Sequence, residues 1–339
     1  MKRLRSAALA GVIAAMGAFS TPVQAQDFYA GKTITMSTHG GVGGEYDAYL
    51  RLLQRFIGKY IPGNPSIQVI NQVGAGGLLA INHAAKLAPQ DGTHLVMAAN
   101  GLLLFQAIGA PGLQESLGKF KWIGNFSAAN GITVVRAETG IKSIEDARQR
   151  SYNIGSSGAG SISALLPMAH NALAGTKFKV VQGYEGAAKM NLAMRAGELD
   201  GRSGSTWPAF LTDFPEAKDG WLVPLSQAGE VRDSRLPNVP LLVEIVGDDP
   251  EKKAAARLVS LALNQNRSFA APPGVPDDRV ALLRTAFEKA LVDPEFVAGA
   301  NMHGLDITWR KGSDVEKTVR EVLNQPKDVV DMTKKALTQ

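Results

Sequence analysis

The chain has 339 residues, a formal net charge of +5 and no cysteine. Lys2, Arg3 and Arg5 carry three of the positive charges, so residues 26–339 carry a net charge of +2. The lack of cysteine excludes disulfides and thiolate chemistry, and the lack of a basic cluster interleaved with aromatic residues argues against a nucleic-acid partner. The length exceeds the size at which one hydrophobic core usually divides, so two domains are expected.

The first 25 residues have the pattern of a secretory signal peptide. A basic start precedes an apolar run from Ser6 to Phe19, and Val23 and Ala25 are small residues at the positions that a signal peptidase requires. The apolar run is shorter than the roughly 20 residues that cross a bilayer, which makes an uncleaved membrane anchor the weaker alternative. We expect export and cleavage after Ala25.

Short β-branched runs alternate with helical stretches along the chain, which is typical of an α/β fold. Strands are predicted, in chain order, at Thr33–Ser37, Ile67–Ile70, Thr93–Ala98, Ile132–Val135, Tyr152–Gly155 and Phe178–Val181. Helices are predicted where Leu50, Leu53, Ile57 and Tyr60 recur at helical spacing, at Leu78–Lys86, and at Ile144–Arg150, which a capping box of Ser143 and Asp146 begins. A proline-rich passage, Leu236–Pro240, precedes a helix-rich C-terminal third.

Three strand-to-helix junctions are dense in glycine: His39–Gly44, Val73–Gly77 and Gly155–Ser161. Glycine lets backbone N–H groups point at a ligand, and a helix N-terminus adds partial positive charge and unpaired donors. If the three loops converge on one cleft, they form an anion site that needs no lysine or arginine. The alternative is that they are only tight turns.

The loops do not match the common nucleotide motifs. None contains Gly-Lys followed by Ser or Thr, as a P-loop requires. None matches G-x-G-x-x-G with an acidic residue about 20 positions further on, as a dinucleotide site requires. The carboxylate or phosphate of a small solute remains as the expected anion.

Enzyme motifs are also missing. Ser157 fails the G-x-S-x-G pattern of a nucleophile elbow because Ala159 stands where glycine is needed. The five histidines have no metal-binding spacing, so neither a metal nor a cofactor is expected. His39 opens the first glycine loop and is a candidate ligand contact, whereas Asp47 is expected mainly to cap the following helix. An exported serine hydrolase that uses Ser157 or Ser161 stays as the alternative function.

Six short motifs occur in the order found in one family. They are G-G-x-x-D at Gly43–Asp47, G-A-G-G at Gly74–Gly77, P-x-D-G-T at Pro89–Thr93, G-S-x-G-x-G-S at Gly155–Ser161, Y-x-G at Tyr184–Gly186 with G-E-x-D-G at Gly197–Gly201, and A-P-P-G-x-P at Ala271–Pro276. With these motifs the chain resembles the solute-binding receptors of tripartite tricarboxylate transporters, the Bug receptors, over nearly all of residues 26–339. Thr38–Val42 lacks the prolines common in the family, and Val73 and Leu241 also depart from its pattern.

The resemblance implies an α/β fold in the form of a two-domain, type II-like periplasmic-binding-protein clamshell. Each domain is expected to be a mixed sheet flanked by helices. Domain 1 is expected to comprise residues 26–128 and 238–339, and domain 2 residues 129–237. The chain would cross between them near Phe126–Gly131 and Leu236–Leu241, and the two domains would close over the ligand.

The resemblance also implies a periplasmic, monomeric receptor without enzymatic activity. It would capture a small carboxylate, such as a di- or tricarboxylate or an aromatic acid, and deliver it to integral-membrane transporter subunits; presenting the ligand to a sensor is a further alternative. The ligand-binding residues carried over are His39, Gly41, Gly43, Gly44, Glu45, Tyr46, Asp47, Gly74, Ala75, Gly76, Gly77, Ser156, Ser157, Gly158, Asp200, Arg202, Ser205 and Trp207. Among these, Arg202 is a candidate partner for a second carboxylate and Trp207 for stacking.

Overall fold

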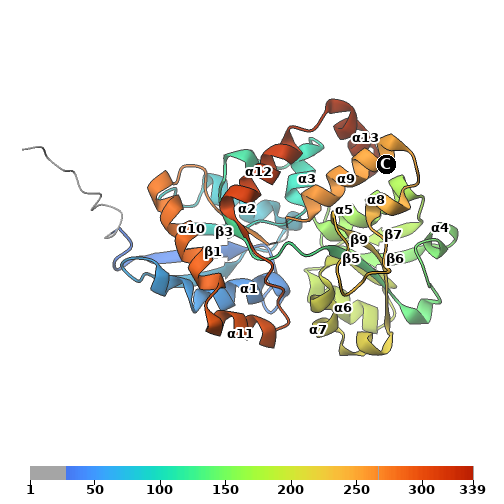
Figure 1. The fold of residues 1–339 in the computed structure, drawn as a ribbon, viewed down its shortest axis with the longest axis horizontal. Coiled ribbons are helices and arrows are strands. Elements are labelled where there is room, and N and C mark those ends of the chain that lie inside the picture. The colour runs from blue at the N-terminus through green and yellow to red at the C-terminus, as the bar shows by residue number, and fades with distance from the viewer. Residues whose placement is uncertain (1–27, 266, 339) are drawn as a thin grey trace, which may run out of the picture.

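The computed structural model of the chain describes residues 28–265 and 267–338. The predicted signal peptide and its cleavage site lie outside these residues. Two sheets, each flanked by helices, form two lobes that lie side by side (Figure 1). We call the lobe with the six-stranded sheet the first lobe and the one with the five-stranded sheet the second lobe.

The sheet of the first lobe has the strand order β11-β4-β10-β3-β1-β2. Its strands are β1 (Thr33–Thr38), β2 (Ser66–Asn71), β3 (His94–Met97), β4 (Lys121–Asn125), β10 (Ser268–Ala271) and β11 (Arg310–Lys311). β1 pairs in parallel with β2 and β3, whereas β10 is antiparallel to β3 and β4, and β11 is antiparallel to β4. The sheet is therefore mixed.

The sheet of the second lobe has the order β7-β6-β8-β5-β9. Its strands are β5 (Gly131–Arg136), β6 (Tyr152–Gly155), β7 (Phe178–Val181), β8 (Gly201–Ser205) and β9 (Leu222–Ala228). β6 is parallel to β7 and β8, and β5 is antiparallel to β8 and β9. Together the two mixed sheets confirm the predicted fold class.

All six predicted strands are present, and β6 and β7 have the predicted bounds. β8 was not predicted, because Gly-Arg-Ser-Gly-Ser has neither hydrophobic residues nor an alternating pattern. It is nevertheless buried along its whole length, since it lies between β6 and β5 in the centre of its sheet. Its neighbours, and not its own composition, decide its conformation.

Helices alternate with most of the strands along the chain. They are α1 (Glu45–Gln54), α2 (Leu78–Lys86), α3 (Leu102–Ala107), α4 (Asp146–Gln149), α5 (Ile162–Ala169), α6 (Ala187–Arg195), α7 (Trp207–Asp213), α8 (Leu242–Ile245), α9 (Pro250–Leu263), α10 (Asp277–Leu291), α11 (Pro294–Met302), α12 (Gly312–Leu323) and α13 (Lys327–Thr338). α2 has the predicted bounds, and the predicted first helix is divided into α1 and a 3₁₀ turn at Ile57–Tyr60. The expected capping box is only half formed: the N-cap of α4 is Glu145, and Asp146 accepts a hydrogen bond from the amide of Ser143 at 3.1 Å.

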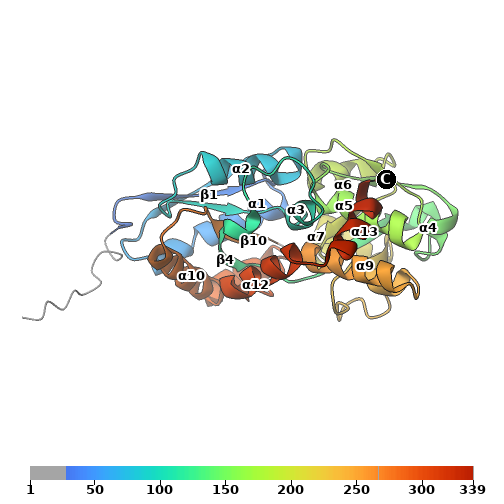
Figure 2. The ribbon, with the colours of Figure 1, turned by 90° about the horizontal axis from the view of Figure 1, so that it is seen from above.

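Helix packing, in addition to the crossings of the chain, joins the two lobes. β4 of the first sheet leads directly into β5 of the second, and the chain re-enters the first sheet at β10. α9 contacts α5 and β9 in the second lobe as well as α3 and α12 in the first, although it falls within the range predicted for domain 1. Figure 2 shows α12 and α13 running in succession from the first lobe to the second. The exact domain boundaries stay a prediction.

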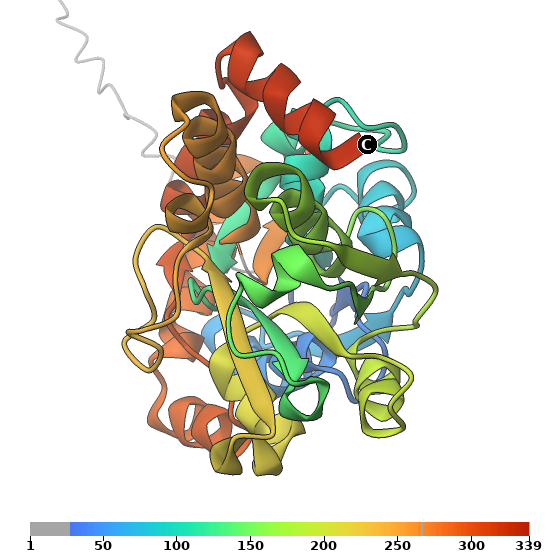
Figure 3. The same cartoon turned by 90° about the vertical axis from the view of Figure 1, so that its right-hand side faces the viewer.

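Hydrophobic residues gather in three clusters. Successive residues of β3 point to opposite faces of the sheet. Met97 belongs to a cluster of the first lobe that includes Phe126, whereas Val96 belongs to the largest cluster. That largest cluster continues through α9 to Leu165 of α5, so one apolar layer extends across both lobes. A third cluster, which includes Phe210, lies on the other face of the second sheet. Figure 3, viewed from the second lobe, shows α13 above this sheet. None of the helices in the described ranges combines the length and apolar character needed to cross a membrane.

Candidate functional site

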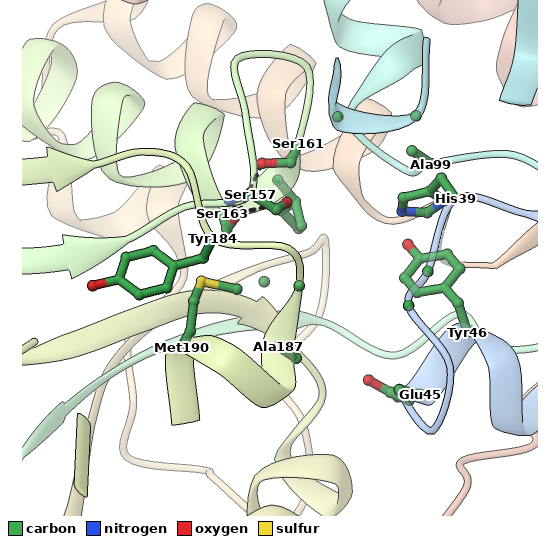
Figure 4. A pocket seen from close by; sticks show the side chains of 18 of the residues that line it. His39, Glu45, Tyr46, Ala99, Ser157, Ser161, Ser163, Tyr184, Ala187 and Met190 are labelled. Carbon is green, nitrogen blue, oxygen red and sulfur yellow. Dashed lines mark hydrogen bonds between the residues drawn. The ribbon is translucent and has the colours of Figure 1, made fainter. Parts of the chain in front are cut away.

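A cavity of about 280 Å³ lies between the two lobes. The first lobe lines it with the loops that follow β1 and β2, and the second lobe with β8 and the loops that follow β6 and β7. These loops begin at the carboxyl ends of parallel strands, which is where α/β sheets usually bind ligands. In Figure 4, His39 and Tyr46 face Ser157 and Ser161 across the cavity.

Asp47 shapes the first loop. Its Oδ2 accepts hydrogen bonds from the Gly43 amide and from Arg51 Nε, both at 2.9 Å, and its Oδ1 accepts one from Asn71 Nδ2 at 2.9 Å. Asn71 also donates to the carbonyl of Gly40 at 2.8 Å. Burial raises the pKa of Asp47, but these donors outweigh it and lower the pKa overall. Asp47 therefore stabilises the first loop through the Gly43 amide. It does not occupy the expected capping position, because the N-cap of α1 is Gly44.

His39 and Tyr46 form the aromatic part of the cavity wall on the first lobe. Their rings meet edge to face with centroids 4.3 Å apart. Burial lowers the pKa of His39 to about 4, against a weaker opposing hydrogen bond at the Met97 backbone, so the ring is neutral at pH 7. Burial also raises the pKa of Tyr46. At pH 7 these two rings are therefore neutral, and the charged groups of the cavity are other residues.

The second and third glycine loops touch each other across the cleft. A Cβ atom on Gly76 would lie 3.0 Å from the backbone nitrogens of Gly160 and Ser161, and one on Gly158 would lie 3.1 Å from the nitrogen of Gly76. Both Gly76 and Gly158 have positive φ, at 65° and 143°. Any other residue would be strained at these φ values, and its Cβ would require the facing backbone to give way by a few tenths of an ångström. The glycines therefore permit the lobes to approach.

The third loop lines its side of the cavity with hydroxyl groups. Ser161 Oγ lies 2.7 Å from both Ser163 Oγ and the carbonyl oxygen of Gly158, and the Ser157 amide donates to Ser163 Oγ at 3.1 Å. These hydroxyls are hydrogen-bonded to one another and to a backbone carbonyl. A serine hydrolase would instead pair one of them with a base.

Arg202 contributes a buried cation from the second lobe. Its side chain is 1% exposed, its Nη1 donates to Ser205 Oγ at 2.6 Å and its Nη2 pairs with Asp213 Oδ2 at 2.6 Å. The guanidinium also lies over the ring of Phe210, 4.4 Å from its centroid. These contacts hold the group in one orientation at the cavity wall.

Arg267 contributes a second buried cation, from the first lobe. It is 1% exposed, its Nη2 forms an ion pair with Glu45 Oε1, and its guanidinium carbon lies 5.3 Å and 5.4 Å from the ring centroids of Tyr46 and Tyr49. Burial lowers the pKa of Arg202, Asp213 and Glu45 oppose this effect, and Arg267 adds to it. Charges on the two lobes are therefore close enough to influence each other.

The structure brings most of the predicted ligand-binding residues together. The cavity is lined by His39, Gly41, Gly44, Glu45, Tyr46, Gly74, Gly76, Gly77, Ser157, Arg202 and Ser205. The other predicted residues near the cavity do not line it: Gly43, Ala75, Ser156 and Gly158 in the loops, Asp47 in α1 and Trp207 at the start of α7. Asp200 lies at the opposite end of β8, where its Oδ2 accepts from the Asn153 amide at 2.7 Å. Ligand contact stays a prediction for all of them.

Sequence reasoning missed several cavity residues. Ser161, Ser163, Glu185, Met190 and Arg267 also line the cavity. Ser161 is the last residue of the motif in the third glycine loop, so the sequence pattern could have indicated it. Arg267 lies in no motif, and its ion pair with Glu45 joins residues more than 200 positions apart. No motif or pattern in the neighbouring sequence indicates that Arg267 lines the cavity.

Comparisons with known proteins agree with this architecture. Residues 54–334 match the model of the tripartite tricarboxylate transporter family receptor. This match spans well over half of the chain. The protein belongs to that receptor family. The predicted family is therefore confirmed.

Individual relatives cover almost the entire chain. The UPF0065 protein in the gbd 5' region of Cupriavidus necator is 25% identical over 335 residues, which is 96% of this chain and 95% of that protein. MatC from Rhodopseudomonas palustris, solved with bound malate, has a TM-score of 0.69 and 21% identity and covers 88% of this chain and 99% of its own. Another R. palustris protein, solved with adipate, has a TM-score of 0.68 and 19% identity, with coverages of 89% and 97%. These two structures share the fold of this receptor.

Three histidines of the receptor are kept neutral by the fold. Burial lowers the pKa values of His39, His94 and His170 to about 4 each. His170 is fully buried; its Nδ1 donates to the Leu166 carbonyl at 2.7 Å and its Nε2 accepts from Ser226 Oγ at 2.5 Å. Protonating this ring in place would leave a buried charge without a counter-ion among these contacts.

We predict that the receptor loses stability as the pH falls from about 6.5 towards 4. In the unfolded chain a histidine takes up its proton near pH 6.5, whereas in the fold it does so only near pH 4, so the stabilisation is complete above 6.5 and declines below it. Each histidine then removes up to about 1.4 kcal/mol of unfolding free energy per pH unit. Urea unfolding between pH 7.5 and 5.0 measures this slope. His170→Gln should be less stable at pH 7.5 yet have a shallower slope; an equal slope would contradict the assignment.

Proposed function

We propose that this receptor captures a small carboxylate in the cavity between its lobes and delivers it to the membrane permease of a tripartite transporter. The observation that carries the proposal is the cavity itself. Glycine loops from both lobes meet around it, and buried Arg202 and Arg267 line it. The volume of about 280 Å³ is near the lower end of small-molecule sites, which suits a small acid.

The relatives support the same ligand class. Two solved structures with this fold hold malate and adipate, and both compounds are dicarboxylates. Hydrogen bonds to a charged group contribute roughly 1.5–3 kcal/mol each. Four or five of them, less the cost of ordering, are sufficient for the roughly 8 kcal/mol of a micromolar site.

We propose that binding occurs without chemical conversion of the ligand. The hydroxyls of Ser157, Ser161 and Ser163 are hydrogen-bonded among themselves and to the Gly158 carbonyl. Neutral His39 is on the first lobe, across the cavity from them. This arrangement gives no support to the serine hydrolase alternative.

The first prediction of this proposal concerns the ligand. A screen of about a hundred small carboxylates by thermal unfolding of residues 26–339 should find at least one that stabilises the protein, by about 2.7 kcal/mol at 100 times its dissociation constant. The neutral amide of the same compound is the matched control and should have no comparable effect. Chromatography of the recovered ligand should show it unchanged. Stabilisation by no carboxylate, or conversion of the ligand, would contradict the proposal.

We further propose that the mature receptor begins at Gln26 and works in the periplasm as a monomer. The basis is the N-terminal sequence, in which a short apolar run ends at Val23 and Ala25. Expression of the full chain in a Gram-negative host, followed by intact-mass measurement of the periplasmic fraction, should give the mass of residues 26–339. A mass that includes residues 1–25 would show that the segment is retained.

Closure over the ligand depends on the approach of Gly76 to the third loop. Gly76→Ala should weaken carboxylate binding at least about tenfold, a difference of 1.4 kcal/mol, because the new Cβ meets the backbone of Gly160. Gly140→Ala is the matched control: Gly140 also has a left-handed φ, of 79°, but a Cβ there meets nothing within 4 Å.

Calorimetry and solution scattering measure the two effects together. The radius of gyration of the wild type and of the Gly140→Ala variant should fall when the carboxylate found in the screen is added, and that of the Gly76→Ala variant should fall less. If all three proteins bind and contract alike, closure does not depend on this glycine.

A further inference from the structure

Two buried guanidiniums face the cavity from opposite lobes, and the proposed function requires only one anion site. Arg267 precedes β10 of the first sheet, and Arg202 is the second residue of β8 in the second sheet. Each is only 1% exposed. Burying a charged group in this way is costly unless its donors and its charge are matched.

In each guanidinium, only some of the nitrogen atoms have a hydrogen-bond partner. Arg267 Nη2 pairs with Glu45, while its Nε and Nη1 have no hydrogen-bond partner in the described part of the chain. Arg202 uses Nη1 and Nη2 on Ser205 and Asp213, while its Nε has no partner in the same residues. Three nitrogen atoms of these two guanidiniums are therefore buried without an acceptor, in side chains that line the cavity.

The partners that are present keep these free donors in place. Glu45 and the tyrosine rings hold Arg267, and Asp213 with the ring of Phe210 holds Arg202. Each arginine is held by residues of its own lobe, so its donors are oriented before the lobes meet. A ligand oxygen that reaches them gains a charge-assisted hydrogen bond at little ordering cost.

Formal charge alone does not attract an anion here. Glu45 and Asp213 balance the two arginines, and Glu185 adds a negative charge at the rim. An acid therefore gains favourable binding free energy only where its oxygens reach an unpaired N–H group. This arrangement selects ligands by the position of their carboxylates more than by total charge.

We propose that Arg267 and Arg202 are the specificity-determining residues of the cavity, and that each holds one carboxylate of a ligand that bridges the two lobes. The inference rests on the proposed function and adds the arrangement of the ligand to it. Met190, Ala187 and Ile162 also line the cavity and offer apolar surface to a short carbon chain between the two carboxylates. An acid with one carboxylate satisfies one arginine and leaves the other unmatched.

The test compares diacids with their half-amides on the unmodified mature protein. Calorimetric titrations use malate, succinate and adipate, with succinamate and adipamate as ligands of nearly the same shape that have lost one carboxylate. We expect each diacid that binds to do so at least about tenfold more tightly than its half-amide, since one charge-assisted pair is lost.

Variants then assign the two carboxylates. Arg202→Gln and Arg267→Gln should each reduce the preference for the diacid to within about threefold. Arg232→Gln, which removes a surface arginine paired with Glu244, is the control and should keep the full preference. If a glutamine variant does not fold, the lysine variant at the same position keeps a charge but loses the planar donor geometry and should lower the preference.

The outcomes separate this inference from the proposed function. If no carboxylate binds at all, the proposed function and this inference both fail. If half-amides bind as tightly as diacids, or if either arginine variant keeps the full preference, the receptor function stands and the two-arginine arrangement is wrong.

Discussion

The close approach of two backbones at Gly76 is the constraint on which the site depends. Gly76 belongs to the first lobe, and Gly158, Gly160 and Ser161 belong to the second, with no side chain between them. Because the lobes touch through main chain at this point, the walls of the cavity are brought within reach of one small molecule. The cavity of this structure has the two loops in this contact, and a single methyl group at Gly76 would require the facing backbone to shift.

The apolar layer restricts how the lobes can separate. The largest hydrophobic cluster runs from Val96 in the first sheet through Leu258 of α9 to Leu165 of α5, so it is shared by both lobes. Exposing that layer to water would be costly, whereas parting the glycine loops exposes mainly polar backbone that water can hydrogen-bond. Movement between the lobes is therefore expected at the loops that line the cavity, with the shared layer kept intact.

The sequence was sufficient for the fold class and for the glycine loops of the site, but not for every strand or every charged residue. Glycine at strand-to-helix junctions is a local signal, so the three loops and their shared cavity were predicted correctly. β8 and Arg267 carry no local signal. β8 is a strand because its neighbours pair with it, and Arg267 reaches the cavity because the chain returns to the first sheet at β10. The predicted anion site needed no lysine or arginine and offered Arg202 as the partner for a second carboxylate, but it did not include Arg267.

In the proposed function, glycines and arginines have different roles in ligand recognition. Glycines such as Gly76 supply the close approach of the loops, and they belong to the motifs by which the family was recognised. Arg267 lies outside those motifs, and Arg202 directly follows one of them. Each is held by a carboxylate of its own lobe. A chain of the same fold can therefore keep its glycine loops and exchange such side chains, which alters the ligand while leaving the closing contact unchanged.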